Sequence, residues 1–142
     1  MSAIVWKDEL ELGLPLIDEQ HRRLVECYNE LAAAYRRREA DVELAHRLGV
    51  LLDCAAVHFD AEEALMDELG YVGLDEHREE HRDLLQRVRR FQTVLNEGRQ
   101  TVTLPVLQYL QHWLLGHHRG ADADFGKAAR RIIAEALVAQ PS

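Results

Sequence analysis

The chain has 142 residues, of which 47% are hydrophobic and 30% are charged, and its formal net charge is -8. This length allows one domain with a buried core, and the charge of mixed sign is ordinary for a globular protein. The acidic balance, without a basic stripe, argues against a nucleic-acid-binding surface, and no apolar run approaches the roughly 20 residues that span a bilayer.

Residues 1–17 predict an irregular arm, because Gly13 and Pro15 interrupt any regular pattern. The start of the arm is charged and lacks the apolar core of a signal peptide, so we expect a cytoplasmic location. Asp18 is predicted to be the N-cap of a first helix over residues 18–38.

Three more long helices are predicted, over residues 41–69, over residues 74–96, and from a cap at Thr101 or Thr103 to between Gly116 and Gly120. A last amphipathic segment covers residues 122–138. Long helices with short links predict an all-α fold, an antiparallel up-down-up-down four-helix bundle. We expect one domain over residues 1–142, with the arm at 1–17, the bundle at 18–121 and a short C-terminal helix within 122–142.

The apolar stripes of these helices contain side chains that ordinarily avoid a protein core. The stripe positions, three or four residues apart, include His21, His58, Glu62, His77, His81 and His117. Burying so many titratable groups without partners would cost several kcal/mol. A metal site satisfies them together, so the pattern predicts one in the core.

The spacing of these residues brings them to one layer of the bundle. His58 and Glu62 are four residues apart, as are His77 and His81, so each pair lies on one face of its helix. Asp122 follows His117 by five residues, which would turn it away by about 140° on a continuous helix. Two nearby glycines indicate a loosening backbone, so we expect Asp122 to reach back from the helix end.

The donor set favours particular metals. Imidazole and carboxylate without a thiolate cluster suit iron, manganese or zinc, and ligands on all helices of a bundle are typical of di-iron centres. Five imidazoles, two bridging carboxylates and a shared oxygen leave one position open around two six-coordinate metals, as a reactive site requires. The excess of neutral imidazole favours reversible oxygen binding over high-valent oxidation chemistry.

These motifs resemble the hemerythrin family, and especially its single-domain bacterial forms, the bacteriohemerythrins. The matching residues run from Trp6 to Phe125 and comprise Ile17-Asp18-Glu19-Gln20-His21, His58-Phe59-Asp60-Ala61-Glu62, His77, His81, and Trp113-Leu114-Leu115-Gly116-His117 with Asp122. The resemblance implies two iron ions in an oxygen-bridged, non-haem centre spanned by Glu62 and Asp122. It further implies that His77, His81 and His117 hold one iron, and that His21 and His58 hold the other, which keeps the open position.

The resemblance also implies a wall for the oxygen pocket. Leu24, Phe59, Trp113 and Leu114 lie within one helical turn of the ligands and match pocket positions, although core packing alone also explains them. His118 departs from the family, in which many members have isoleucine at this position. Its ring either turns toward solvent at a frayed helix end or places a proton donor beside bound oxygen.

The function implied is reversible binding of dioxygen, or of another small diatomic or anion, for storage, delivery or sensing. No catalytic residue is assigned, and we expect a binding protein and not an enzyme. The alternatives are a di-iron enzyme acting on peroxide or nitric oxide, and a regulatory module that responds to oxygen or iron. Cys27 and Cys54 are predicted to be small buried residues with reduced thiols, with a redox pair as the alternative.

Overall fold

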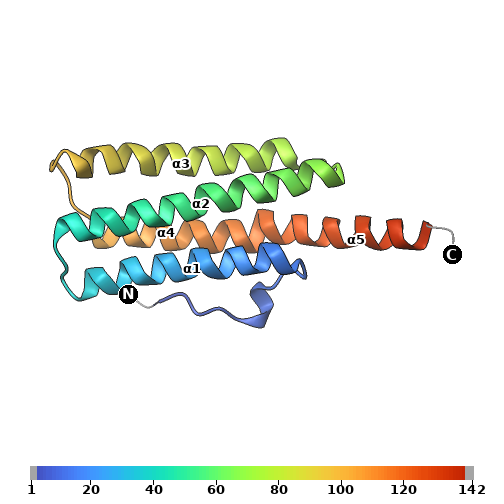
Figure 1. Ribbon diagram of the computed structural model, residues 1–142, viewed down its shortest axis with the longest axis horizontal. Coiled ribbons are helices and arrows are strands. Elements are labelled where there is room, and N and C mark those ends of the chain that lie inside the picture. Colours follow the sequence, from blue (N-terminus) through green and yellow to red (C-terminus); the bar gives the residue numbers. More distant parts are fainter. Residues whose placement is uncertain (1–2, 140–142) are drawn as a thin grey trace.

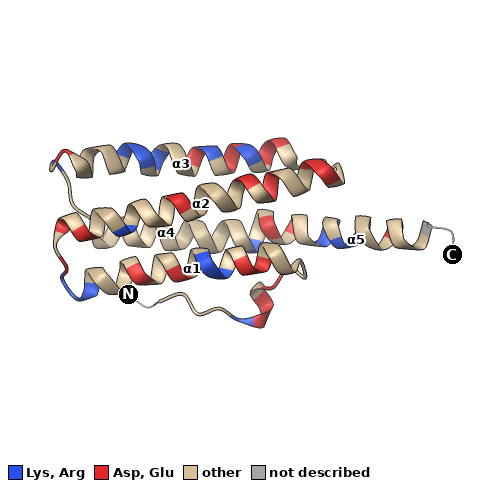
Figure 2. Ribbon diagram, in the orientation of Figure 1, with Lys and Arg blue, Asp and Glu red and all other residues tan. Residues whose placement is uncertain are grey.

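A computed structural model describes residues 3–139 of the chain and confirms the predicted all-helical bundle. Helices α1 (Pro15–Arg36), α2 (Asp41–Leu69), α3 (Leu74–Asn96) and α4 (Leu104–His117) run alternately up and down, with short connections at opposite ends (Figure 1). Charged residues of both signs are spread along the helices and are frequent on α3 (Figure 2). Within residues 3–139, no helix combines the length and the apolarity needed to cross a membrane.

The turn between α2 and α3 depends on Gly70. This residue adopts a left-handed conformation with φ of 66°, which a residue without a Cβ adopts without strain. The Gly70 amide donates to the Asp67 carbonyl and the Tyr71 amide donates to the Met66 carbonyl, so two of the last carbonyls of α2 are satisfied. The chain therefore reverses within a few residues, and α3 packs antiparallel against α2.

The start of α1 differs from the prediction. The helix begins at Pro15, because proline at a first helical position fixes φ and needs no amide partner. Asp18 therefore lies inside the helix and is not its N-cap. Its buried carboxylate instead accepts hydrogen bonds from the amides of Leu12, Gly13 and Leu14, at 2.7, 3.1 and 3.2 Å, and ties the arm to α1.

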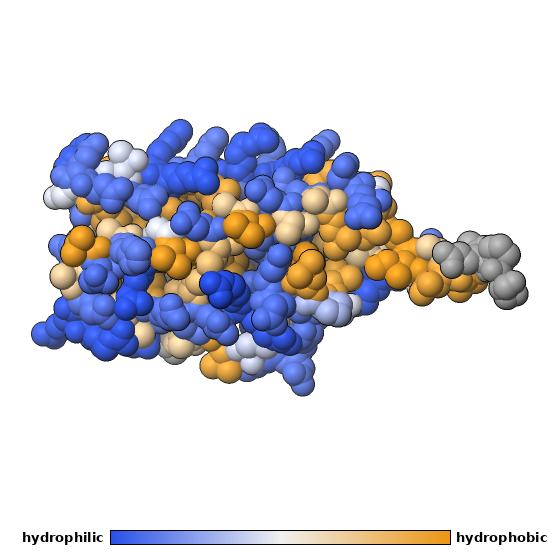
Figure 3. Space-filling view, in the orientation of Figure 1, coloured by the Kyte–Doolittle hydropathy of each residue, from blue (hydrophilic) through white to orange (hydrophobic). Residues whose placement is uncertain are grey.

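The end of α4 also differs from the prediction. The helix does not fray there: a π-helical segment, η2 (His118–Asp122), joins α4 to α5 (Ala123–Ala139) without a break. The two helices form one long rod, and the later part of α5 extends beyond the bundle (Figure 1). Exposed Leu137 and Val138 contribute to its apolar surface, which stands out from the largely hydrophilic surface of the bundle (Figure 3).

Two apolar clusters fill the interior. The larger one occupies most of the bundle, with Tyr28, Leu31 and Leu48 fully buried. The smaller one lies where the arm, α2 and α5 meet and consists of Leu12, Leu14, Ile17, Met66, Phe125 and Ala129. Along α1, α2 and the α4–α5 rod, the buried histidines and acids lie near the sequence positions where the larger cluster gives way to the smaller one.

The buried carboxylate of Asp18 gives a first testable prediction. Replacing it with alanine leaves buried amides of the arm without an acceptor, so we expect Asp18→Ala to lower the free energy of unfolding by roughly 2–4 kcal/mol. Asp18→Asn keeps one acceptor oxygen and should cause a smaller loss. The measurement is urea denaturation of the metal-free protein followed by circular dichroism.

Glu19→Gln is the matched control, because the Glu19 side chain is 74% exposed and only pairs with Arg22 at 3.6 Å. It should change the free energy of unfolding by less than about 0.5 kcal/mol. Equal losses from Asp18→Ala and Glu19→Gln would show that the hydrogen bonds to the arm contribute nothing measurable.

Candidate metal centre

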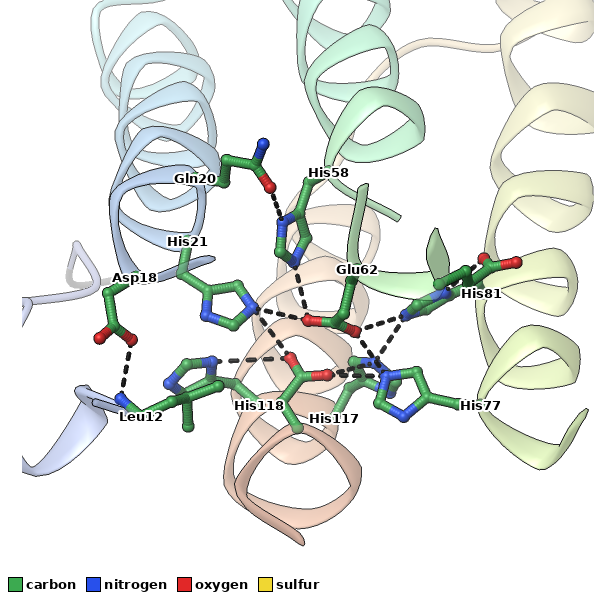
Figure 4. Close-up of polar contacts among 12 residues, drawn as sticks. Leu12, Asp18, Gln20, His21, His58, Glu62, His77, His81, His117 and His118 are labelled. Atoms are coloured by element: carbon green, nitrogen blue, oxygen red, sulfur yellow. Dashed lines mark hydrogen bonds and ion pairs between the residues drawn. The ribbon is translucent and has the colours of Figure 1, made fainter. Parts of the chain in front are cut away.

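All seven side chains predicted as metal ligands are buried, and their potential ligand atoms gather in one layer of the bundle. Figure 4 labels six of them, all but Asp122. They come from every helix of the bundle and from the π-helical segment: His21 from α1, His58 and Glu62 from α2, His77 and His81 from α3, His117 from α4 and Asp122 from η2. Their potential ligand atoms form two groups, and within each group these atoms lie within 4.8 Å of one another.

The two groups differ in size and share both carboxylates. One contains three histidines, His77, His81 and His117, with Glu62 and Asp122. The other contains two histidines, His21 and His58, with the same two carboxylates. We call them the three-histidine group and the two-histidine group. A cluster of histidine, glutamate and aspartate able to hold metal is therefore present in the core.

The carboxylate of Glu62 lies between the two groups. Its Oε1 is 2.6 Å from His77 Nε2 and 3.3 Å from His81 Nε2. Its Oε2 is 3.2 Å from His58 Nε2 and 3.4 Å from His21 Nε2. Each oxygen thus faces a different group, which is the arrangement of a carboxylate that can bridge two cations.

Asp122 divides its oxygens in the same way. Its Oδ1 is 2.9 Å from His77 Nε2 and 3.0 Å from His117 Nε2, and its Oδ2 is 3.1 Å from His21 Nε2. The π-helical segment explains how this is possible. Hydrogen bonds in a π-helix join residues five apart, so the spacing from His117 to Asp122 returns both to one face.

The polar atoms at the centre of the cluster lack ordinary hydrogen bonds. Both nitrogens of His21, Nε2 of His58 and both oxygens of Glu62 are buried without a partner in hydrogen-bond geometry, although the ring nitrogens and carboxylates lie close together. Such unsatisfied groups are costly in a core, and cation ligation satisfies them. The residues present therefore fit a pair of metal ions that imidazole and carboxylate bind.

Electrostatics in the cluster favour ionised carboxylates. Burial raises the pKa of Glu62 and of Asp122, and the charge of Asp122 raises that of Glu62 further, but the close histidine nitrogens outweigh these effects and hold both pKa values well below the usual range. Burial lowers the pKa of His21 and of His77, but Asp122 and Glu62 raise both to about 9. For His58 burial prevails, and its pKa is lowered. Without metal, the positive charges of protonated His21 and His77 therefore offset the negative charges of the two carboxylates.

Three further residues orient the histidines from behind. Gln20 Oε1 accepts a hydrogen bond from His58 Nδ1 at 2.9 Å, which leaves Nε2 directed at the cluster. Glu63 Oε2 accepts from His81 Nδ1 at 2.9 Å, and Glu80 Oε2 lies 3.3 Å from His117 Nδ1. Sequence reasoning did not assign these contacts, since Gln20 and Glu63 only stand beside a ligand in the sequence.

Aromatic rings cover the cluster on the side of the larger apolar core. Phe59 stacks on His81 with centroids 3.8 Å apart, and Trp113 stacks on His117 at 4.5 Å. Leu24, which follows His21 by three residues, is buried in the larger apolar cluster, and Leu114 packs against that cluster. All predicted pocket residues other than His118 thus belong to, or pack against, the apolar core beside the polar layer.

One of the two alternatives for His118, a ring that turns toward solvent, is wrong. Its ring is buried, and because the Leu10 carbonyl can only accept, Nε2 donates to it at 2.6 Å. Its Nδ1 lies 3.6 Å from Asp122 Oδ2, and its ring meets that of His21 edge-on. The π-helical segment holds this side chain inward, where it fastens the arm over the cluster. Whether it donates a proton to a bound ligand stays a prediction.

Comparison with known proteins places this fold and site in a family. Residues 12–129 match the model described as the hemerythrin HHE cation binding domain. A bacteriohemerythrin of Pseudomonas aeruginosa (strain LESB58) is 33% identical over 135 residues, which cover 95% of this chain and 87% of that protein. A hemerythrin-like protein of Naegleria gruberi is 28% identical over 124 residues, 87% of this chain and 92% of that protein.

The chain belongs to the hemerythrin family. A bacteriohemerythrin of Methylococcus capsulatus (strain ATCC 33009 / NCIMB 11132 / Bath) is also similar, with 26% identity over 89% of this chain and 96% of that protein. The fold agrees with a crystal structure of wild-type hemerythrin, with a TM-score of 0.82 and 23% identity over 89% of this chain and 97% of that one. None of these relatives is named as an enzyme, in agreement with the prediction of a binding protein.

The raised histidine pKa values predict how metal binding depends on pH. At pH 7, His21 and His77 carry protons in the metal-free protein, because their pKa values are about 9. A metal ion must displace these protons, so its apparent affinity should rise with pH toward 9, by roughly ten-fold per pH unit for each proton displaced. Calorimetric titration with Zn²⁺ in two buffers of different ionisation enthalpy measures the protons released.

The pH series in a single buffer provides the check. Affinity that stays constant between pH 7 and about 9, with no proton release, would contradict the assignment of charged His21 and His77 in the metal-free cluster.

The contact of Glu63 with His81 gives another prediction. Glu63→Gln removes the charge behind His81 and makes its Nε2 a weaker ligand, so we expect metal affinity to fall by about 10–100-fold. Competition with a chromophoric chelator measures the affinity. Arg78→Gln is the control, because Arg78 pairs at 3.2 Å with Oε1 of the same carboxylate, whereas His81 pairs with Oε2. Equal losses of metal affinity in both variants would mean that any disturbance around Glu63 weakens binding, and that the charge of Glu63 beside His81 has no specific effect.

Proposed function

We propose that this protein binds dioxygen reversibly at a pair of iron ions, for oxygen storage, delivery or sensing. Glu62 and Asp122 would bridge the ions. His77, His81 and His117 would hold one, and His21 and His58 the other. When bound, the iron pair would supply the electrons through which dioxygen is held and then released. Iron is supported by the family and by the imidazole–carboxylate donors.

The observation that carries this proposal is the unequal number of histidines around two shared carboxylates. The three-histidine group offers one more imidazole than the two-histidine group, while Glu62 and Asp122 contribute an oxygen to each. Two identical cations bound in these groups would have different numbers of protein ligands. The two-histidine group then has room for a small ligand, and an open position distinguishes reactive metal sites from structural ones.

The surroundings support binding of a small apolar molecule. Phe59 and Trp113 stack on imidazoles of the three-histidine group, and Leu24 and Leu114 extend the apolar wall. Dioxygen partitions readily into such surroundings, whereas water and ions do not. Exclusion of water also slows displacement of a bound ligand and strengthens the electrostatic contacts inside the site.

The side chains of the chain itself have defined tasks in this proposal. Gln20 and Glu63 hold His58 and His81 in the orientation that directs Nε2 at the cluster. His118 joins the arm to the π-helical segment and closes the end of the site. We further propose that residues 1–142 act as one domain, since the arm and α5 both pack on the second apolar cluster. The cytoplasmic location stays a prediction.

The test is oxygen-dependent absorption. The protein is supplied with ferrous iron without oxygen, exposed to air, and then returned to argon. We expect two iron ions per chain and a visible charge-transfer band that appears with oxygen and disappears under argon. Two bound irons without such a band would contradict the proposal, and rapid turnover of peroxide or nitric oxide would favour an enzyme instead.

Variants connect the band to the proposed ligands. Glu62→Ala should abolish it, because both metal positions depend on this carboxylate. His58→Ala should weaken iron binding mainly at one position. His46→Ala is the matched control, since His46 is an exposed histidine of the same helix and should leave iron content and band unchanged. Loss of the band in His46→Ala would show that the assignment of ligands is wrong.

A further inference from the structure

The two cysteines of the sequence face each other across α1 and α2. Cys27 Sγ and Cys54 Sγ are 3.1 Å apart, although 27 positions separate the residues in the chain. Cys27 is buried in the larger apolar cluster, and Cys54 is half-buried against it. The sequence prediction of small buried residues thus describes Cys27, while the contact of the sulfurs brings back the alternative of a redox pair.

The geometry requires little movement for a bond. The sulfurs of a disulfide are about 2.05 Å apart, so the two atoms must approach by roughly 1 Å. Rotation of the two side chains can supply this approach, because the sulfurs already point toward each other from adjacent antiparallel helices. The chain has no further cysteine that could compete for either thiol within one molecule.

We propose that Cys27 and Cys54 form a reversible intramolecular disulfide when the protein meets hydrogen peroxide. The Cys54 sulfur attacks the peroxide, the O–O bond breaks, and Cys54 becomes a sulfenic acid while water leaves. The Cys27 sulfur then attacks the Cys54 sulfur, the S–O bond breaks, and a second water leaves. Two thiols lose two electrons and two protons, and one peroxide becomes two waters. Iron and oxygen binding are not needed for this reaction.

The surroundings of the two thiols determine the order of the steps. Burial, together with the hydrogen bond and charge of Cys54, raises the pKa of Cys27 to about 12, so Cys27 stays protonated while Cys54 is reduced. Cys54 is the more exposed thiol and meets the oxidant first. Once Cys54 carries a sulfenic acid, its contribution to the Cys27 pKa is lost, although that of burial remains. Cys27 is the thiol that attacks, because its sulfur is already in contact with that of Cys54.

The bond would act on one half of the candidate metal centre. Cys54 precedes His58 by four residues on the same face of α2, and Cys27 follows His21 by six residues on α1. A disulfide would therefore fasten together the two helices that carry the two-histidine group. It would leave α3 and α4, which carry the three-histidine group, without a new link. Oxidation would thus restrain relative motion of His21 and His58.

The test uses the full-length protein, treated with hydrogen peroxide, quenched and alkylated, with mass spectrometry of the cysteine-containing peptides. We expect the Cys27 and Cys54 peptides to be joined, with loss of the mass of two hydrogen atoms and no alkylation, in a chain that stays monomeric on a non-reducing gel. Dithiothreitol should restore both thiols. The oxidised form should unfold at a temperature higher by roughly 5–10 °C, as expected for a cross-link that closes a loop of this length.

Cys27→Ser and Cys54→Ser are the matched variants, and both keep every proposed metal ligand. Neither should lose two hydrogens or gain thermal stability on oxidation, and in Cys27→Ser the isolated Cys54 should accumulate added oxygen or link two chains. The proposal is overturned if peroxide leaves both wild-type thiols open to alkylation. It is also overturned if the wild type mainly adds oxygen to Cys54 or forms disulfides between chains.

Discussion

Two buried carboxylates, each shared between two sets of imidazoles, are the constraint on which the rest of the structure depends. Glu62 and Asp122 are almost without solvent contact, and an unpaired charge in such surroundings would be strongly destabilising. Their oxygens face histidines from α1, α2, α3 and α4. The register of these helices is therefore fixed at one layer, because a shift of one residue would rotate an imidazole out of the core.

The arm and the π-helical segment seal that layer from one end. Asp18 binds three amides of the arm, and His118 donates to the Leu10 carbonyl, so an irregular segment is held against the cluster by buried hydrogen bonds. The smaller apolar cluster completes the seal with Phe125 and Met66. The dry surroundings of the polar layer thus depend on residues outside the regular part of the bundle.

The fold and the burial of six of the seven predicted ligands could be inferred from the sequence because their signal is local. Steps of three or four residues identify the buried face of a helix, and Glu62 or His77 on that face already indicates a polar core. The sequence also predicts an inward Asp122, but the structural reason differs. Its spacing of five suggested a helix end, whereas a π-helical segment keeps the helix continuous and directs the carboxylate inward.

The remaining differences arise from contacts between segments that spacing cannot reveal. Asp18 looks like a helix cap until Pro15 is seen to begin the helix, which frees the carboxylate to bind the arm. Glu63 and Glu80 reach histidines of a neighbouring helix, so their contacts depend on how the helices pack. The contact of Cys27 with Cys54 depends in the same way on the register between α1 and α2.

These contacts add a second asymmetry to the unequal number of histidines. Carboxylates stand behind His81 and His117 in the three-histidine group, while a neutral amide, that of Gln20, stands behind His58. A carboxylate makes an imidazole a stronger donor than an amide does. The three-histidine group would therefore offer a metal ion more donors and stronger ones. Under the proposed function, exchange of a small ligand would then take place at the two-histidine group. The histidines of the two-histidine group come from α1 and α2, the helices that also carry Cys27 and Cys54. A disulfide between these cysteines would therefore act beside the position proposed for the exchanging ligand.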